Sequence, residues 1–136
     1  MVHEDDEREP KSQELVDSAR LHAKGGAFTR ALGFLDKALV ATPRSPSLWI
    51  EMARVLAGKG DVDEAVEALD HALDLEPGHA RAHFERGVLL TELGRTGEAI
   101  LAFAASVELR PEFEVQVREA LAIRPDGKFE IAVVRS

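Results

Sequence analysis

Two histidines stand at a spacing that can bind a metal ion. His79 and His83 are four residues apart, which would place both imidazoles on one face of a helix, as in many zinc sites. Such a pair needs further ligands, and no convincing third ligand accompanies it. The chain has no cysteine, which excludes a thiolate metal site, a disulfide scaffold and a cysteine nucleophile. We therefore expect the two histidines to pack, and we predict no metal and no cofactor.

Glycine-rich turns and paired acids are the other residues whose types could support catalysis. Glycines cluster at residues 25–26, 58–60 and 94–97, but none has the GxxxxGK[ST] spacing of a phosphate-binding loop, and no strand pattern precedes them. They are interpreted as turns between helices. The acids Asp63 and Glu64 fall at exposed helical positions, and no nucleophile accompanies a base and an orienting partner. The sequence therefore predicts that the protein is not an enzyme.

The composition limits the classes of partner. The 136 residues have a net charge of −8, and 45% are hydrophobic. Because nucleic acids and anionic membranes are bound mainly through Lys and Arg, we expect neither as a partner. The acidic start of the chain lacks the apolar stretch of a secretory signal, and no segment approaches the ~18 apolar residues that span a bilayer. A cytoplasmic protein without membrane insertion is therefore expected.

Several residue types recur every 34 residues, and this period indicates how the chain is divided into structural elements. It is typical of stacked supersecondary units, each of which covers an apolar flank of its neighbour. Small residues suit close helix crossings, and proline ends each unit because it cannot continue a helix. The columns are Gly26, Gly60 and Gly94; Ala31, Ala65 and Ala99; Leu35, Leu69 and Phe103; Ala38, Ala72 and Ser106; and Pro43, Pro77 and Pro111.

These columns resemble the tetratricopeptide repeat family, whose pattern is W-x2-L-G-x2-Y, then A-x3-F, then P. The second unit has Trp49, Met52, Ala53 and Leu56 in its first half, and the three units match in register over residues 12–113. The resemblance implies an all-α, right-handed superhelical array of three helix-turn-helix units. It also implies a non-catalytic module that binds proteins.

The chain is divided by this period and by its composition. The charged, apolar-poor N-terminus is expected to be disordered, and an amphipathic segment after the third unit is expected to cap the array. The predicted segments are a disordered acidic N-terminus at 1–11, repeat units at 12–45, 46–79 and 80–113, a capping helix at 114–124 and an extended or strand-like tail at 125–136.

The resemblance further implies a concave groove lined by the first helix of each unit, in which a partner peptide would bind. Carried onto this chain, it predicts an exposed apolar stripe, an acidic row beside it and several arginines. Such a groove suits an extended peptide with apolar side chains and charges of both signs. Alternatively, the charges are a solvated helix face whose members pair locally. The predicted groove residues are Val16, Arg20, Ile50, Glu51, Arg54, Arg81, Phe84, Glu85 and Val88.

One subgroup of the family binds a C-terminal carboxylate through a clamp of Lys, Asn and Arg side chains. The chain contains no Asn, and the clamp positions hold two acids, Glu51 and Glu85, which would repel a carboxylate. We therefore do not expect a chaperone-tail adaptor of this kind.

The last segment breaks the helical pattern. After the turn signal at residues 125–127, apolar residues alternate at Phe129, Ile131 and Val133, which is typical of a half-buried strand. A lone strand is unstable in water, so the tail is expected to enter its own groove, enter a neighbour's groove or pair with another tail. The main functional hypothesis is an adaptor or assembly subunit. The alternatives are a self-assembling scaffold and a chaperone that holds an unfolded client, as in bacterial secretion systems.

Overall fold

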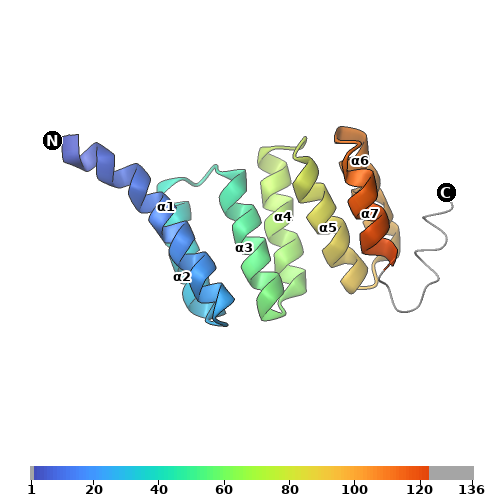
Figure 1. Ribbon diagram of the computed structural model, residues 1–136, viewed down its shortest axis with the longest axis horizontal. Helices are drawn as coiled ribbons and strands as arrows, with labels where there is room; N and C mark the ends of the chain where they lie inside the picture. Colours follow the sequence, from blue (N-terminus) through green and yellow to red (C-terminus); the bar gives the residue numbers. More distant parts are fainter. Residues whose placement is uncertain (1, 123–136) are drawn as a thin grey trace. The chain divides into compact units, whose positions relative to one another are not determined.

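The structure, a computed structural model, describes residues 2–122 (Figure 1), with side chains described for residues 12–121. Within that range the chain is all α-helical and forms no strand, which confirms the predicted fold class. The tail residues Phe129, Ile131 and Val133 lie outside the described residues. The helices are α1 (Val2–Lys24), α2 (Phe28–Ala41), α3 (Pro46–Lys59), α4 (Val62–Leu75), α5 (Ala80–Glu92), α6 (Thr96–Leu109) and α7 (Phe113–Ala122).

The chain forms two compact units, which are described separately. Unit 1 (Met1–Leu75) contains α1 to α4, and unit 2 (Glu76–Ser136) contains α5 to α7. In each unit, consecutive helices pair as antiparallel hairpins. None of the described helices combines the length and the apolar character that crossing a membrane requires.

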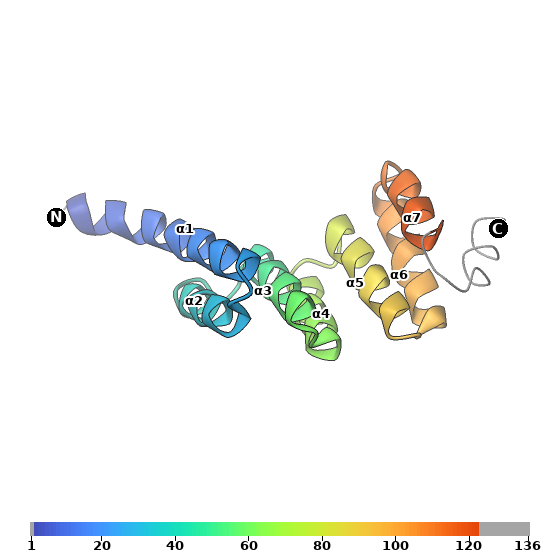
Figure 2. The ribbon, with the colours of Figure 1, turned by 60° about the horizontal axis from the view of Figure 1, so that its bottom comes forward.

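Unit 1 consists of the hairpins α1–α2 and α3–α4, with α3 packed against both α1 and α2 (Figure 2). Its core is formed by the small and apolar columns of the repeat. Ala31, Leu35, Ala65 and Leu69 are all completely buried. The alanines permit close approach of the helices, and the leucines fill the space beside them. Burial of these side chains is the main source of stability for such short helices.

Unit 2 consists of the hairpin α5–α6, with α7 packed on both helices. Ala99 is completely buried, and Phe103 is 3% exposed. The ring of Phe103 lies against the backbone of Gly87, where an added Cβ would stand 2.8 Å from two ring carbons. Helix α7 buries its own apolar face, formed by Phe113, Val117 and Leu121.

The helix ends show why the turns fall where they do. Ser45 caps α3 by accepting a hydrogen bond from the amide of Leu48 at 3.3 Å, and Pro46 occupies the first turn. Both features are typical of a helix start. The glycine of each hairpin turn has a positive φ, as at Gly60 with φ of 101°, a conformation that glycine adopts without steric cost.

The first helix starts earlier than the first repeat unit. Helix α1 begins at Val2 and therefore includes most of segment 1–11, for which disorder was expected. Glu, Arg and Lys are good helix formers, and adding residues to an existing helix is far easier than nucleating one. A charged segment can thus extend a helix that is held by its later turns.

Candidate functional site

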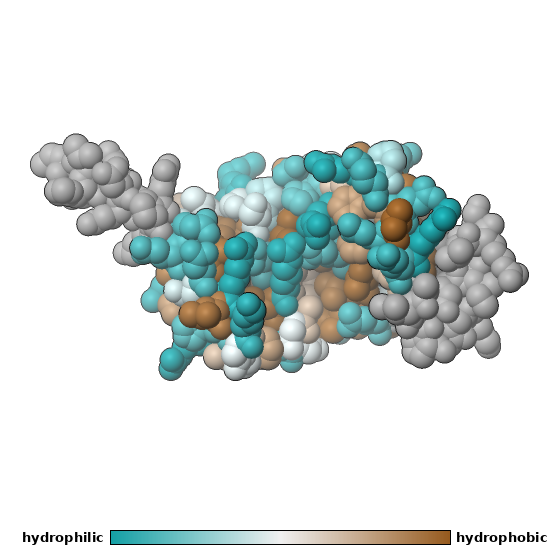
Figure 3. Space-filling view, viewed as in Figure 1, coloured by the Kyte–Doolittle hydropathy of each residue, from teal (hydrophilic) through white to brown (hydrophobic). Residues whose placement is uncertain are grey.

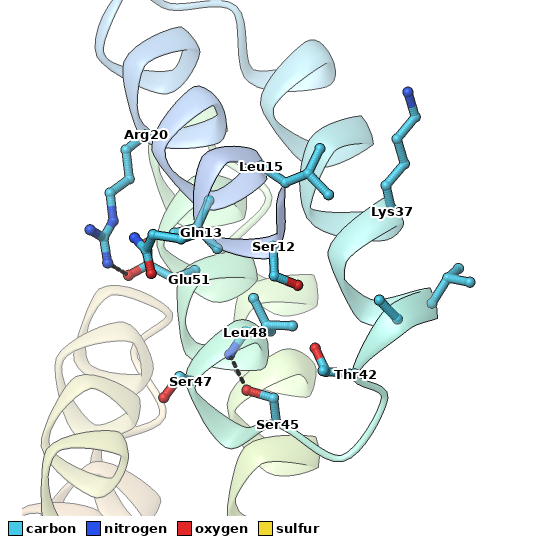
Figure 4. Close-up of a pocket in the computed structure, with 13 residues that line it drawn as sticks. Ser12, Gln13, Leu15, Arg20, Lys37, Thr42, Ser45, Ser47, Leu48 and Glu51 are labelled. Carbon is cyan, nitrogen blue, oxygen red and sulfur yellow. Dashed lines mark hydrogen bonds and ion pairs between the residues drawn. The ribbon is translucent and has the colours of Figure 1, made fainter. Parts of the chain in front are cut away.

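Unit 1 contains a wide hollow of about 1130 Å³, open to solvent, which we call the unit 1 pocket. Its walls come from the middle of α1, the end of α2 and the start of α3 (Figure 4). Apolar side chains form much of the lining, namely Leu15, Val16, Val40, Ala41 and Leu48. Polar side chains contribute hydrogen-bonding groups, namely Ser12, Gln13, Thr42, Ser45 and Ser47, and the charged lining residues are Arg20, Lys37 and Glu51.

Beside the pocket, three predicted groove residues form one ionic network. Arg20 on α1 donates to Oε2 of Glu51 on α3 at 2.5 Å, and Arg54 donates to the same oxygen at 3.3 Å. The residue Glu51 is only 8% exposed. The hydrogen bond and the charge of Glu51 raise the pKa of the Arg20 guanidinium. The network joins α1 to α3, so these charges are engaged within the protein.

The pocket also has a cation with no such partner. Lys37 lies on the α2 wall (Figure 4), is exposed, and forms no ion pair with the residues that the structure describes. It stands on the opposite side of the hollow from Arg20 in that view. The charge of Lys37 is therefore available to a bound group, whereas that of Arg20 is already engaged by Glu51.

The expectation of an exposed apolar stripe is wrong for its first two members. Val16 is 8% exposed and Ile50 is 4% exposed, so both belong to the core. A helix that packs between neighbours buries more than one face, and position within the repeat does not reveal how far that burial extends. Val40, a large apolar residue at the pocket, is 84% exposed. It was not among the predicted groove residues because it lies on α2, the second helix of the first repeat, whereas the groove was expected on the first helix of each repeat.

The predicted groove residues of unit 2 take part in packing α7. The ring of Phe84 stacks on that of Phe113 with centroids 5.5 Å apart, and it also lies 5.8 Å from the ring of Phe103. The guanidinium of Arg81 lies over Phe113 at 5.8 Å and pairs with Glu85 at 3.6 Å. The aromatic ring of Phe84 therefore joins α5 to α6 and α7.

Val88, the remaining predicted groove residue, lies on α5 and is half-buried. Like Phe84, it lies in unit 2, whereas the pocket and the network of Arg20 and Glu51 lie in unit 1. The structure thus brings together Val16, Arg20 and Glu51 at one pocket, with Arg54 bound to Glu51 beside it.

The histidines have structural contacts. Nδ1 of His79 accepts a hydrogen bond from the amide of Ala82 at 3.2 Å and caps α5, and Nε2 of His83 donates to the carbonyl of Pro77 at 2.9 Å. Both rings thus hold the turn before α5. Among the described residues, no group of three or more His, Cys, Asp or Glu side chains could hold a metal ion.

The surface around the site is mainly hydrophilic. In the view of Figure 3, polar side chains cover much of α3 and of the coloured part of α1, with apolar side chains between them. This distribution agrees with the net charge of −8 and with a face that meets water when nothing is bound. The apolar lining of the unit 1 pocket is therefore a local feature.

Comparison with sequence families gives two matches. Models described as "Tetratricopeptide repeat" match residues 22–74 and 50–112, which together span most of the chain. Neither model indicates an enzyme. No curated protein matches the sequence.

Comparison with solved structures gives the same fold at low sequence identity. A structure of MamA from Desulfovibrio magneticus RS-1 has a TM-score of 0.77 at 22% identity, covering 92% of this chain and 72% of that one. The Yersinia enterocolitica type III secretion chaperone SycD, in complex with a peptide of the translocator YopD, has 0.73 at 16%, covering 90% and 91%. The first repeat domain of Spaghetti (RPAP3), bound to the HSP90 peptide SRMEEVD, has 0.69 at 22%, covering 83% and 94%.

Proposed function

The chain belongs to the tetratricopeptide repeat family, and we propose that it is a non-catalytic protein-interaction module whose unit 1 pocket binds an extended peptide. The observation that supports this most directly is the pocket itself. It combines an apolar lining and several small polar groups with Lys37, a cation that forms no ion pair with the described part of the chain. Sites of this composition bind ligands through an apolar anchor and a few placed hydrogen bonds. Apolar contacts supply affinity there, and the polar groups orient the ligand.

The lining indicates the chemistry of the peptide. An aliphatic or aromatic side chain would pack against Leu15, Leu48 and Val40, and Val40 would lose most of its present exposure. The amides and carbonyls of an extended chain have no partners of their own. The hydroxyl of Ser47 would hydrogen-bond this backbone, and Oγ1 of Thr42, whose proton goes to the carbonyl of Ala38, would accept from a peptide amide. A carboxylate of the peptide would pair with Lys37.

Two relatives in fold support a peptide rather than a folded domain as the ligand. The solved structures of SycD and of the Spaghetti domain contain bound peptides. The likeness to this chain concerns the fold alone, so it supports the class of ligand and not its sequence. The chain has a net charge of −8, and the buried carboxylate of Glu51 lines the pocket. Both would repel a peptide that carries several carboxylates.

Selection of peptides from a random phage-displayed library on the immobilised full-length protein tests the proposal. Selected peptides are then titrated by fluorescence anisotropy against the wild type and against Val40→Glu. Burying the valine side chain is worth about 1.5 kcal/mol, so its replacement by a charge should weaken binding by about tenfold or more. Lys37→Glu should weaken binding specifically for peptides that contain an acid.

The matched control is Val115→Glu, the same change at a residue of α7 that is 63% exposed and belongs to unit 2. It should bind the selected peptides as tightly as the wild type, and both variants should keep the helical circular dichroism spectrum. Peptides that bind Val40→Glu and the wild type equally would place their site elsewhere and overturn the proposal.

A further inference from the structure

The outward face of α6 is apolar, which is unusual for the second helix of a repeat unit in this chain. Leu101 is 71% exposed and Ile100 is 38% exposed, and Ala104 beside them is also exposed. Ile100 and Leu101 stand four and three residues before Ala104, and side chains at these two spacings are neighbours on a helix. The three residues therefore form a single surface, which we call the α6 apolar face. Exposed apolar groups that adjoin one another commonly mark a binding surface.

The same repeat positions in α4 are occupied differently. The residue 34 positions before Leu101 is Glu67, which is exposed, and the one before Ala104 is Asp70. The equivalent of Ile100 is Val66, which is only 3% exposed. The α6 apolar face is therefore not a property of the repeat pattern but a feature of the last unit.

The described chain ends at about the level of this face along α6. Helix α7 follows the turn after α6 and packs back along it (Figure 1). Its ten residues rise about 15 Å at 1.5 Å each, so α7 ends about level with the tenth residue before the end of α6. That level is the one at which Ile100 and Leu101 lie. The last described helix thus ends at about the level of Ile100 and Leu101 along α6.

The residues that follow have a matching apolar pattern. Phe129, Ile131 and Val133 alternate with other residues, and Phe129 comes only seven positions after Ala122. Seven extended residues span up to about 23 Å, which exceeds the length of about 21 Å that the fourteen residues of α6 have. The segment is therefore long enough to reach any part of the face.

We propose that residues 125–136 dock on the α6 apolar face of their own chain, with Phe129, Ile131 and Val133 covering Ile100, Leu101 and Ala104. The short connection favours the same chain over a second copy, because a tethered segment has an effective concentration in the millimolar range. Micromolar protein cannot match this concentration. The proposal uses a different helix from the unit 1 pocket and does not depend on the proposed function.

Because the chain has no cysteine, engineered cysteine pairs in the full-length protein test the docking. The first pair is Leu101→Cys with Ile131→Cys, and its control is Glu119→Cys with Ile131→Cys. Glu119 is exposed on α7 and only twelve residues from Ile131, so an undocked segment would reach it easily. Disulfide formation is followed by non-reducing electrophoresis and mass spectrometry under mild oxidation.

Docking predicts that the first pair forms an intramolecular disulfide at least about tenfold faster than the control pair. Ala104→Cys with Ile131→Cys, which retains Leu101, should do the same, so loss of the leucine cannot hide the effect. Adding Ile100→Glu should reduce both rates to that of the control. Equal rates for all pairs would overturn the proposal, and disulfide-linked dimers from the first pair would replace it by docking on a second copy.

Discussion

The contact between Gly87 and Phe103 provides a sharp prediction about the packing of α5 on α6. In the first two repeat units the equivalent residues are Ala19 with Leu35 and Ala53 with Leu69, and all four are at most 1% exposed. The third repeat instead pairs Gly87, which has no side chain, with Phe103, which is larger than leucine. We expect these two differences to compensate for each other, so that Gly87→Ala alone disrupts the crossing.

The magnitude follows from two opposing effects. Alanine in a helix interior is favoured over glycine by about 0.5–1 kcal/mol. The new Cβ of Gly87→Ala would stand 2.8 Å from two ring carbons of Phe103, and overpacking of this kind costs about 1–3 kcal/mol. The single change should therefore destabilise unit 2 by roughly 1–2 kcal/mol. Phe103→Leu alone leaves a gap above Gly87 and should cost about 1–1.5 kcal/mol.

The double variant, which recreates the Ala–Leu pair of the other units, should be within about 0.5 kcal/mol of the wild type. Urea unfolding followed by circular dichroism of all four proteins gives the coupling energy, with an expected value of about 2 kcal/mol or more. A Gly87→Ala variant more stable than the wild type would refute the reasoning. Additive effects in the double variant would show that the two positions do not compensate.

Two other predictions concern the alanine column and a surface carboxylate. Ala65→Glu should unfold unit 1, because it places an unpaired charge at a site with no exposure. Thermal unfolding checks this prediction. The control is Ala41→Glu at an exposed site, which should change the free energy of unfolding by less than about 0.5 kcal/mol. Hydrogen bonds from Arg95 lower the pKa of Glu98, so stability from this pair is present above the ordinary pKa of a glutamate and is lost as pH falls through the lowered value. Carbon-detected NMR titration of the Glu98 carboxyl should show the lowered pKa, and Arg95→Gln should return it toward the ordinary value; an unchanged titration would contradict the assignment.

The architecture could be predicted from the sequence because it depends on local and periodic features. The buried alanines and leucines at 34-residue spacing, such as Ala65 and Leu69 with no exposure, determine where two helices of one unit cross. Turn glycines and prolines determine where they end. These features occur in all three repeats, so a helix boundary that is misassigned in one repeat can be recognised by comparison with the other two.

The site could be predicted only in part because its geometry depends on contacts between units of the repeat. Arg20 and Glu51 are 31 residues apart in sequence, and nothing in either local segment shows that they bind each other. Phe84 was predicted to line the groove, and its ring packs on Phe113 of the capping helix. Val40 lies on a second helix, where the resemblance implies no ligand contact, and its exposure at the pocket is visible only in three dimensions.

The stacking of Trp49 on His71 in unit 1, with ring centroids 4.5 Å apart, has a spectroscopic consequence. The chain has one tryptophan and no tyrosine, so essentially all intrinsic ultraviolet emission originates from this indole between α3 and α4. Emission therefore reports unit 1 alone, while far-ultraviolet dichroism reports both units together. A denaturation followed by the two signals at once separates the melting of the two units without any attached dye.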